Sequence, residues 1–295
     1  MKLAYIIMCH KNSRQVSDLI EQVRSPDIDV FIHIDKKAID FSLPKYDNVY
    51  ILPDEQRINI QWGTITVIEA TLNTIRYMIS SNKRYDYVFL ISGQDYPIKS
   101  NKEINDYLHR NKGANYIEIL NHSDKIYERY RKRNEIVYCN WILRSSMIAK
   151  IIKKIYICIT GGYDYSFSIL KRKNNTGLRF EFGSQWWCLT YDCVQWISNY
   201  IDSNRETLAF FSCAAVPDES LFQSIFMISP YRETQRDKLT YLEWEANSNH
   251  PRVFTKKDMS LLQRSECLFA RKFDETIDEE IITLIKNDNN QEQTF

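Results

Sequence analysis

Two acidic residues follow a proline in the stretch CAAVPDESLFQSIF, which covers residues 213–226. Pro217 is suited to the first position of a helix, and Asp218 and Glu219 are suited to its first turn, where the helix dipole is positive. A carboxylate fixed in this way could also act as a general base if it lies within hydrogen-bond reach of the proton that it removes. These residues alone favour the structural interpretation, because acids are common in the first turn of helices.

The composition of the whole chain indicates a globular protein and excludes several classes of function. The 295 residues carry 39 basic and 38 acidic side chains, and a net charge of +1 argues against nucleic acid as the main partner. Hydrophobic residues make up 44% of the chain, which is enough for a sizeable core. With only seven glycines, the chain has neither a G-x-G-x-x-G motif nor a Walker A phosphate loop.

The N-terminal residues and the cysteines bear on the cellular compartment. The first apolar run, roughly six residues long, is too short for a signal peptide, and no window approaches the roughly 20 apolar residues that span a bilayer. We therefore expect a cytoplasmic protein. The cysteines are odd in number and lack C-x-x-C spacing, so we interpret them as free and mostly buried thiols: Cys9, Cys139, Cys158, Cys188, Cys193, Cys213 and Cys267.

Apolar strands alternate with helical periodicity along the first 120 residues. We expect strands at 3–8, 30–34, 49–52, 87–91 and 116–119, and helices near 16–23, 62–80 and 103–109. This alternation predicts an α/β fold with a mainly parallel central sheet flanked by helices. Asp35, Gln94 and Asp95 follow strands directly, and open α/β sheets bind ligands beyond the carboxyl ends of their strands. The pattern locates a site without identifying its ligand.

Two further segments differ in character from the rest of the chain. Residues 141–173 combine apolar runs with lysines and arginines. They predict either solvated amphipathic helices or a face that binds a membrane surface, since apolar and basic faces favour anionic headgroups. Residues 287–295 are polar and predict a flexible tail.

Seven short motifs, taken together, resemble one enzyme family. In chain order they are IHIDKK at 32–37, WG at 62–63, SGQDYPI at 92–98, GSQWW at 183–187, PDES at 217–220, HPR at 250–252 and LFARKFD at 268–274. This series resembles the core-2/I-branching β-1,6-N-acetylglucosaminyltransferases and the peptide O-xylosyltransferases, which form glycosyltransferase family 14. The motifs cover nearly the whole chain, and the GSQWW and HPR motifs are more similar to the xylosyltransferase and bacterial branch.

The resemblance implies both a fold and a reaction. The fold is of the GT-A type, with one domain over residues 1–295, of which about 1–120 bind the nucleotide and about 121–275 carry the acceptor and catalytic groups. The reaction is the inverting transfer of N-acetylglucosamine or xylose from a UDP-sugar to a glycan hydroxyl. The catalytic base of the family falls on Glu219, and Asp218 beside it is expected to cap or orient the turn.

No metal or other cofactor is expected, and the UDP-sugar enters as a substrate. The only Asp-x-Asp sequence, at 27–29, lies before the second strand and is interpreted as a turn at the amino end of the sheet. The family binds the donor diphosphate with basic side chains instead, at positions that match Arg252 and Lys272. Arg offers a bidentate fork and Lys a point charge. Arg271 would point away from Lys272 in an extended segment.

The resemblance also implies which residues contact the nucleoside and the acceptor. Asp35 and Trp62 fall on the nucleoside side, although a turn-capping acid and a core tryptophan are equally open interpretations. Aromatic rings stack on sugars but also fill cores. The spacing near 125–129 and 252–258 departs from the animal enzymes, which leaves the acceptor contacts and the loop over the diphosphate open. The residues implied on the acceptor side are Glu118, Arg129, Trp186, Trp187, Tyr241 and Trp244.

The expected partners are the UDP-sugar donor and a glycan or lipid-linked glycan acceptor. A bacterial-type member would use them to build surface polysaccharide, with residues 141–173 on the inner face of the cell membrane. The chain lacks the membrane anchor and extracellular cysteines of the animal enzymes, so a Golgi location is not implied. The alternatives are a nucleotide-sugar or glycan-binding protein without catalysis, and a glycoside hydrolase, which needs a second carboxylate about 5 to 10 Å from Glu219.

Overall fold

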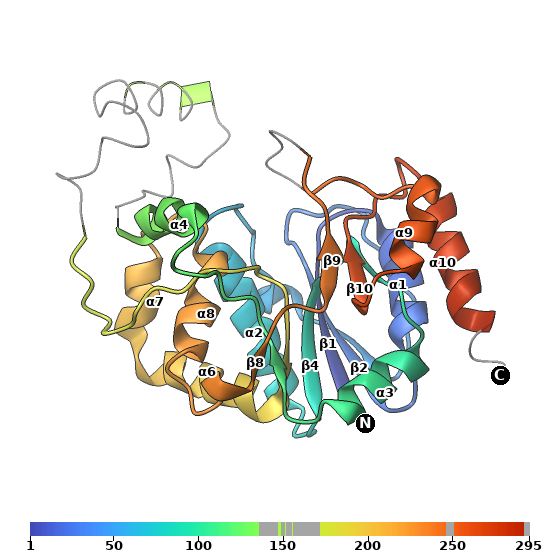
Figure 1. The fold of residues 1–295 in the computed structure, drawn as a ribbon, viewed down its shortest axis with the longest axis horizontal. Coiled ribbons are helices and arrows are strands. Elements are labelled where there is room, and N and C mark those ends of the chain that lie inside the picture. The colour runs from blue at the N-terminus through green and yellow to red at the C-terminus, as the bar shows by residue number, and fades with distance from the viewer. Residues whose placement is uncertain (136–146, 149–150, 152–154, 156–171, 246–250, 292–295) are drawn as a thin grey trace.

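A seven-stranded sheet forms the centre of the molecule (Figure 1). The computed structural model describes residues 1–135, 147–148, 151, 155, 172–245 and 251–291. From one edge to the other, the strands are β3 (Val49–Ile51), β2 (Ile28–Ile34), β1 (Leu3–Cys9), β4 (Tyr87–Ser92), β7 (Trp187–Thr190), β6 (Asn115–Tyr116) and β8 (Gln235–Arg236). The first four run parallel, whereas β7 is antiparallel to β4 and β6. This arrangement confirms the predicted α/β fold with a mainly parallel sheet.

The central strands are buried on both faces because their side chains alternate between two hydrophobic cores. In β1, Tyr5 and Ile7 belong to one core cluster, while Ala4 and Ile6 belong to the other. The first cluster is closed by α1 (Ser13–Val23), α3 (Asn101–Arg110), α9 (Met259–Gln263) and α10 (Glu280–Gln291). The second is closed by α2 (Thr66–Ser80), α6 (Tyr191–Ser203), α7 (Arg205–Phe211) and α8 (Leu221–Phe226), on the opposite side of the sheet (Figure 1).

The helix boundaries differ from the predicted ones for local reasons. Helix α3 begins two residues earlier than expected because Ser100 and Glu103 form a capping box, in which the Ser100 nitrogen donates to the Glu103 carboxylate (2.8 Å). Helix α2 begins only at Thr66 instead of near residue 62. Gly63 has a φ of +75°, which is incompatible with a right-handed helix.

The Asp-x-Asp sequence at 27–29 is not a turn throughout, because Ile28 and Asp29 form the start of β2. Ile28 pairs with Leu3, so the motif does lie at the amino end of the sheet. The carboxylate of Asp29 accepts hydrogen bonds from Lys83 (2.9 Å) and from the Tyr85 hydroxyl (2.7 Å). These contacts give Asp29 a structural role at that end.

A second, smaller sheet was not anticipated from the sequence. Its strand order is β5 (Asp95–Pro97), β10 (Phe269–Arg271) and β9 (Thr240–Leu242). Strand β10 runs antiparallel to β5 and parallel to β9. Because β5 follows β4 after only two residues, this sheet brings the C-terminal part of the chain to the carboxyl end of the central sheet (Figure 1).

The C-terminal segment is more ordered than its composition suggested. Helix α10 continues to Gln291, and the side chain of Asn289 is buried and donates to the carbonyl oxygen of Pro97 (3.1 Å). Residues 287–291 are therefore helical, and only 292–295 lie outside the described residues. Most of the predicted membrane-binding face at 141–173 also lies outside them. No helix among the described residues is long and apolar enough to cross a membrane.

The cysteines agree with the prediction of free thiols wherever the structure describes them. Cys9, Cys188 and Cys193 are free and buried, and Cys213 and Cys267 are free and partly buried. The remaining two, Cys139 and Cys158, lie outside the described residues.

Candidate active site

The 217–219 turn presents the two acids in a different setting from the one predicted. Residues 217–219 form a single 3₁₀ turn, and α8 begins only at Leu221, so the acids precede the helix instead of lying in its first turn. Val216, just before the turn, has a φ of +51°. This conformation is unfavourable for a β-branched residue and occurs mainly where surrounding contacts impose it, often at functional sites. Here the Val216 nitrogen donates to the carbonyl oxygen of Gly63 (2.9 Å).

Glu219 is held by helix α4 (Lys125–Glu135). Its Oε2 accepts a hydrogen bond from Nη1 of Arg133 at 2.6 Å, and its side chain is 29% exposed. Burial raises the pKa of Glu219, the nearby Arg133 lowers it, and the charge of Glu118 raises it again. The net direction is upward. Burial therefore outweighs the lowering effect of Arg133 on the pKa of Glu219.

Asp218 is buried in the 217–219 turn. Its Oδ1 has no hydrogen-bond partner among the described residues. Burial, followed by the charge of Glu219, raises the pKa of Asp218 to about 7. Asp218 is thus a carboxyl group that resists ionisation beside Glu219, and its role in capping or orienting the turn stays a prediction.

Glu118 reaches the same region from the segment after β6. Its Oε2 accepts a hydrogen bond from the Ser184 nitrogen (2.8 Å), and its Oε1 is paired with Lys238. Gly183 lies between the two glutamates, since its nitrogen donates to the Glu219 carbonyl oxygen (3.0 Å). A Cβ atom at Gly183 would lie 1.9 Å from the Glu118 carbonyl oxygen, so only glycine fits there. The structure therefore brings together Glu118 and Glu219, which the sequence had proposed separately.

The end of β10 contributes a second part of the site. Asp95 is fully buried, and its Oδ1 accepts a hydrogen bond from Nη1 of Arg271 at 2.8 Å. The Arg271 guanidinium lies 4.8 Å from the centre of the Trp186 ring. Arg271 is thus engaged with Asp95, and no carboxylate forms an ion pair with the neighbouring Lys272 among the described residues. Burial lowers the pKa of Lys272, and the charges of Arg271 and Lys11 lower it further.

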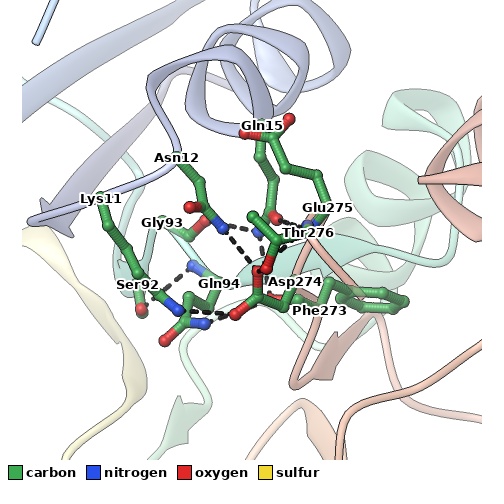
Figure 2. Close-up of polar contacts among 10 residues, drawn as sticks. All are labelled: Lys11, Asn12, Gln15, Ser92, Gly93, Gln94, Phe273, Asp274, Glu275 and Thr276. Carbon is green, nitrogen blue, oxygen red and sulfur yellow. Dashed lines mark hydrogen bonds and ion pairs between the residues drawn. The ribbon is translucent and has the colours of Figure 1, made fainter. Parts of the chain in front are cut away.

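Asp274 is the centre of a polar network that sequence reasoning missed (Figure 2). Its carboxylate accepts hydrogen bonds from Lys11 Nζ (2.6 Å), Asn12 Nδ2 (2.8 Å) and the Thr276 hydroxyl (2.7 Å). Burial alone would raise the pKa of Asp274, but these hydrogen bonds together lower it well below its usual range. The signal in the sequence was the position of Lys11 and Asn12 directly after the first strand, where ligand-binding side chains are expected.

Gln15 completes the attachment of the C-terminal segment (Figure 2). Its side-chain nitrogen donates to the carbonyl oxygens of Gly93 (2.8 Å) and Phe273 (3.3 Å), while its side-chain oxygen accepts from the Glu275 nitrogen (2.8 Å). The segment that carries Lys272 is therefore held against the carboxyl ends of β1 and β4. His10 lies there as well, and the pKa of His10 is lowered first by burial and then by the charge of Lys11. Lys11 and Arg271 are paired with Asp274 and Asp95 at this end, whereas Lys272 has no ion-pair partner among the described residues and suits an anionic ligand.

Arg252 is already paired with acids in this structure. Its Nε donates to Glu243 (2.7 Å), and its two terminal nitrogens donate to the two oxygens of Asp258 (3.0 and 2.9 Å). The hydrogen bond from Arg252 lowers the pKa of Asp258. A diphosphate could contact this guanidinium only by sharing it with these carboxylates or by displacing one of them. Tyr241 supports the arrangement, because its hydroxyl donates to Glu243 (2.5 Å).

The two residues predicted near the nucleoside differ in exposure. Asp35 is buried at the end of β2, where its Oδ1 accepts a hydrogen bond from the Lys37 nitrogen (2.9 Å) and its backbone nitrogen donates to the Cys9 carbonyl oxygen (2.8 Å). Asp35 therefore caps a turn, which was one of its two open interpretations, and this turn lies at the carboxyl end of the sheet beside β1. Trp62 is 68% exposed, which excludes the core role that was left open for it.

The residues predicted on the acceptor side also differ in the exposure of their side chains. Trp187 is only 4% exposed and packs on Phe222 with a ring separation of 5.8 Å, so it is a core residue whose ring is covered. Trp244 is 57% exposed, and Trp186 is partly buried against Arg271. Arg129 falls in α4, and its side chain lies outside the described residues. In the part of the chain that the structure describes, no three metal-binding side chains lie close enough together to hold an ion.

Comparison with known proteins finds one family model and several relatives that match most of this chain. The family model described as "Branch: Core-2/I-Branching enzyme" matches residues 3–264. A β-1,3-galactosyl-O-glycosyl-glycoprotein β-1,6-N-acetylglucosaminyltransferase 4 of Danio rerio is 24% identical over 99% of this chain and 70% of the relative. Xylosyltransferases 1 and 2 of Rattus norvegicus are 23% and 21% identical over 96% and 97% of this chain. The chain spans only 35% and 33% of those two relatives.

Proposed function

This chain belongs to the core-2/I-branching enzyme family, and we propose that it transfers a sugar from a UDP-sugar to a glycan hydroxyl with inversion and without a metal ion. The predicted family membership is thereby confirmed. The observation that carries the proposal is the position of Glu219, a half-buried carboxylate held 2.6 Å from Arg133. Relatives named as N-acetylglucosaminyltransferase and xylosyltransferases support a glycosyltransferase.

In the proposed reaction, Glu219 acts as the general base. The acceptor hydroxyl oxygen attacks the anomeric carbon from the face opposite the diphosphate, and the hydroxyl proton passes to the Glu219 carboxylate. The new bond joins the acceptor oxygen to the anomeric carbon, while the bond to the diphosphate oxygen breaks and its electron pair leaves with UDP. The pKa of Glu219, raised by burial, supports this role because a carboxylate with a higher pKa is a stronger base.

The leaving group needs positive charge, and two predicted residues supply it in this proposal. Lys272 lies in a segment fixed by the Asp274 network, and no carboxylate neutralises it among the described residues. Arg252 would contact the diphosphate after exchanging part of its pairing with Asp258 or Glu243. A fixed lysine and a forked arginine can stabilise the charge that develops on the diphosphate, as a metal does elsewhere.

The residues predicted from the sequence to contact the nucleoside and the acceptor are kept in the proposal, with one exception. Asp35 and Trp62 are proposed for the nucleoside, and Glu118, Arg129, Trp186, Tyr241 and Trp244 for the acceptor. Trp187 is left out because its ring is buried. The transferred sugar is proposed to be N-acetylglucosamine or xylose, in line with the names of the relatives. A lipid-linked acceptor, bacterial surface polysaccharide synthesis and a cytoplasmic position at the membrane complete the proposal.

The experiment that tests the proposal is a transfer assay on the full chain. Purified protein is incubated with UDP-N-acetylglucosamine, UDP-xylose and other UDP-sugars, together with a panel of glycan acceptors, and UDP release and product are measured. We expect glycoside product whose anomeric configuration, read by NMR coupling constants, is opposite to that of the donor. We also expect the same rate in excess EDTA. Retained configuration would contradict inversion, and a loss of activity in EDTA that manganese restores would contradict metal independence.

A further inference from the structure

We propose that Arg133 is a positioning residue for the reaction, which holds the Glu219 carboxylate ionised and fixed in orientation before the acceptor arrives. This inference rests on the proposed function of Glu219 as the base. Arg133 lies in the basic run KIYERYRKR at 125–133, where nothing in the sequence distinguishes it from its neighbours. Its role emerges only from the contacts that the fold creates.

The ion pair between Arg133 and Glu219 is short and partly buried. Arg133 Nη1 lies 2.6 Å from Glu219 Oε2, and the two side chains are only 23% and 29% exposed. The Arg133 guanidinium lies over the ring of Tyr130, 3.8 Å from the ring centre. A stacked guanidinium has little rotational freedom, and a hydrogen bond between charged groups is stronger than a neutral one. The carboxylate is therefore held by an arginine whose own orientation is fixed by Tyr130, one turn earlier on the same helix.

The chain around Arg133 is also attached to the segments before and after Glu219. The Arg133 carbonyl oxygen accepts a hydrogen bond from the Ala215 nitrogen (3.0 Å), ahead of the 217–219 turn. The buried side chain of Asn134 donates to the Ser220 hydroxyl (2.6 Å), directly after it. The end of α4 is thus fixed to the segment that carries the base. Arg133 cannot be regarded as a surface arginine that happens to lie near an acid.

Glu219 is surrounded by acidic groups and, among the described residues, is contacted by one cation, Arg133. The groups that face it are Asp218 from its own turn, Glu118 from the segment after β6, and Arg133 and Tyr130 from α4; Lys238 is paired with Glu118. The charge of Glu118 disfavours ionisation of Glu219, as burial does, whereas Arg133 is the cation in direct contact with it. Without Arg133, the base would hold its proton to a higher pH and would be less available.

Arg131 provides a matched control on the same helix. It is paired with Glu128 (3.0 Å) and Glu135 (2.7 Å) within α4, so its replacement also removes an arginine and two ion pairs. Its hydrogen-bond partners among the described residues are these two glutamates, and they include neither Glu219 nor the 217–219 turn. A change that only weakens α4 should therefore appear in both variants, whereas a change specific to the base should appear only at Arg133.

The test compares the wild-type chain with Arg133→Gln, Arg133→Lys and Arg131→Gln in pH profiles of kcat/KM. An opposite charge within about 4 to 6 Å lowers a carboxyl pKa by about one to three pH units. We therefore expect the acid limb of Arg133→Gln to move up by about one pH unit or more. The rate should fall about tenfold or more below the limb and partly recover at higher pH. Arg133→Lys should move the limb less, and Arg131→Gln should leave it in place.

A second measurement keeps the inference testable without turnover. In protein labelled with ¹³C at glutamate carboxyl groups, the Glu219 resonance can be assigned by its absence from Glu219→Gln and titrated in each variant. We expect a higher pKa of Glu219 in Arg133→Gln and an unchanged one in Arg131→Gln. An unchanged Glu219 titration in Arg133→Gln would overturn the inference even if that variant were less stable. Absence of transfer by the wild-type chain, in contrast, would contradict the proposed function and leave the titration result to decide the role of Arg133.

Discussion

Two adjacent carboxyl groups in the 217–219 turn have different environments, and this difference assigns their roles. Glu219 is paired with Arg133, whereas Asp218 is buried without a cation in direct contact among the described residues. The pKa of Asp218 is raised to about 7, so its ionised form is unfavourable in the folded protein. Contact with Arg133 favours the ionised form of Glu219, which the proposed general base needs, whereas Asp218 is a source of instability at alkaline pH.

Asp218→Asn should stabilise the protein at pH 8 but not at pH 4. Because the folded-state pKa of Asp218 lies above its unfolded value, the wild-type chain loses stability as the pH rises from about 4 to about 7. The uncharged amide avoids this loss and should raise the free energy of unfolding by on the order of 1 to 3 kcal/mol at pH 8. Urea denaturation at both pH values measures the effect. The exposed Asp106→Asn serves as control, and a difference that does not depend on pH would contradict the argument.

At the residue scale, side chains of the same type can serve either the fold or the site, and the sequence does not distinguish the two uses. Glu219 could be proposed because the PDES motif is specific, and Glu118 through the family resemblance alone. The structure places both around the same glycine, Gly183. Trp187 could not be distinguished from a sugar-stacking residue, since aromatic rings fill cores equally well, and the fold buries it. Arg133 was hidden in a basic run, because a one-dimensional pattern does not show which of several cations meets the base.

At the scale of elements, the strand end that carries Lys272 is fixed by the Asp274 network. Lys11 and Asn12 from the end of β1 converge on Asp274, and Gln15 from α1 binds Phe273 and Glu275. The order of this segment thus depends on one buried carboxylate. Its contacts could not be predicted, because Lys11 and Asp274 are far apart in the chain.

Asp274→Ala should destabilise the protein at neutral pH and weaken UDP binding. The folded-state pKa of Asp274 is lowered, so its stabilising contribution is present above the unfolded pKa near 4 and is lost as the pH falls further into the acid range. We expect a loss of about 1 to 3 kcal/mol at pH 7 and a smaller loss at pH 3, measured by denaturant unfolding. Glu279→Gln, which removes the exposed ion pair with Arg14, should cost little at either pH. An equal loss at both pH values would contradict the role of the ionised carboxylate.

Gly183→Ala should disturb the spacing between the two glutamates. The new Cβ would lie 1.9 Å from the Glu118 carbonyl oxygen, and backbone must move to make room for it. Overpacking of this kind costs about 1 to 3 kcal/mol, and we expect transfer activity to fall at least about tenfold as Glu118 and Glu219 shift. Gly113→Ala is the comparison, since a Cβ there meets no atom within 4 Å although its φ is +88°. Equal activity in the two variants would show that the close contact at Gly183 is unimportant.

At the scale of the whole molecule, the two sheets gather distant segments at one end. Strands from both predicted halves share the central sheet, and β10 joins β5 to complete the second one. The parallel strands β1, β2 and β4 could be predicted because runs of six or seven residues dominated by apolar side chains are distinctive. Strands β5, β9 and β10 have three residues each, too few for a recognisable alternation, and they exist because their neighbours pair with them.

The central claim is that this assembly presents Glu219 as the general base to an acceptor bound beside a UDP-sugar. The direct measurement is kcat/KM for transfer by Glu219→Gln, together with the Kd for UDP by calorimetry, and the exposed Glu206→Gln is the control. We expect transfer to fall by roughly 10² to 10⁴-fold, while UDP binds as in the wild-type chain and Glu206→Gln remains fully active. Wild-type turnover by Glu219→Gln would contradict the claim.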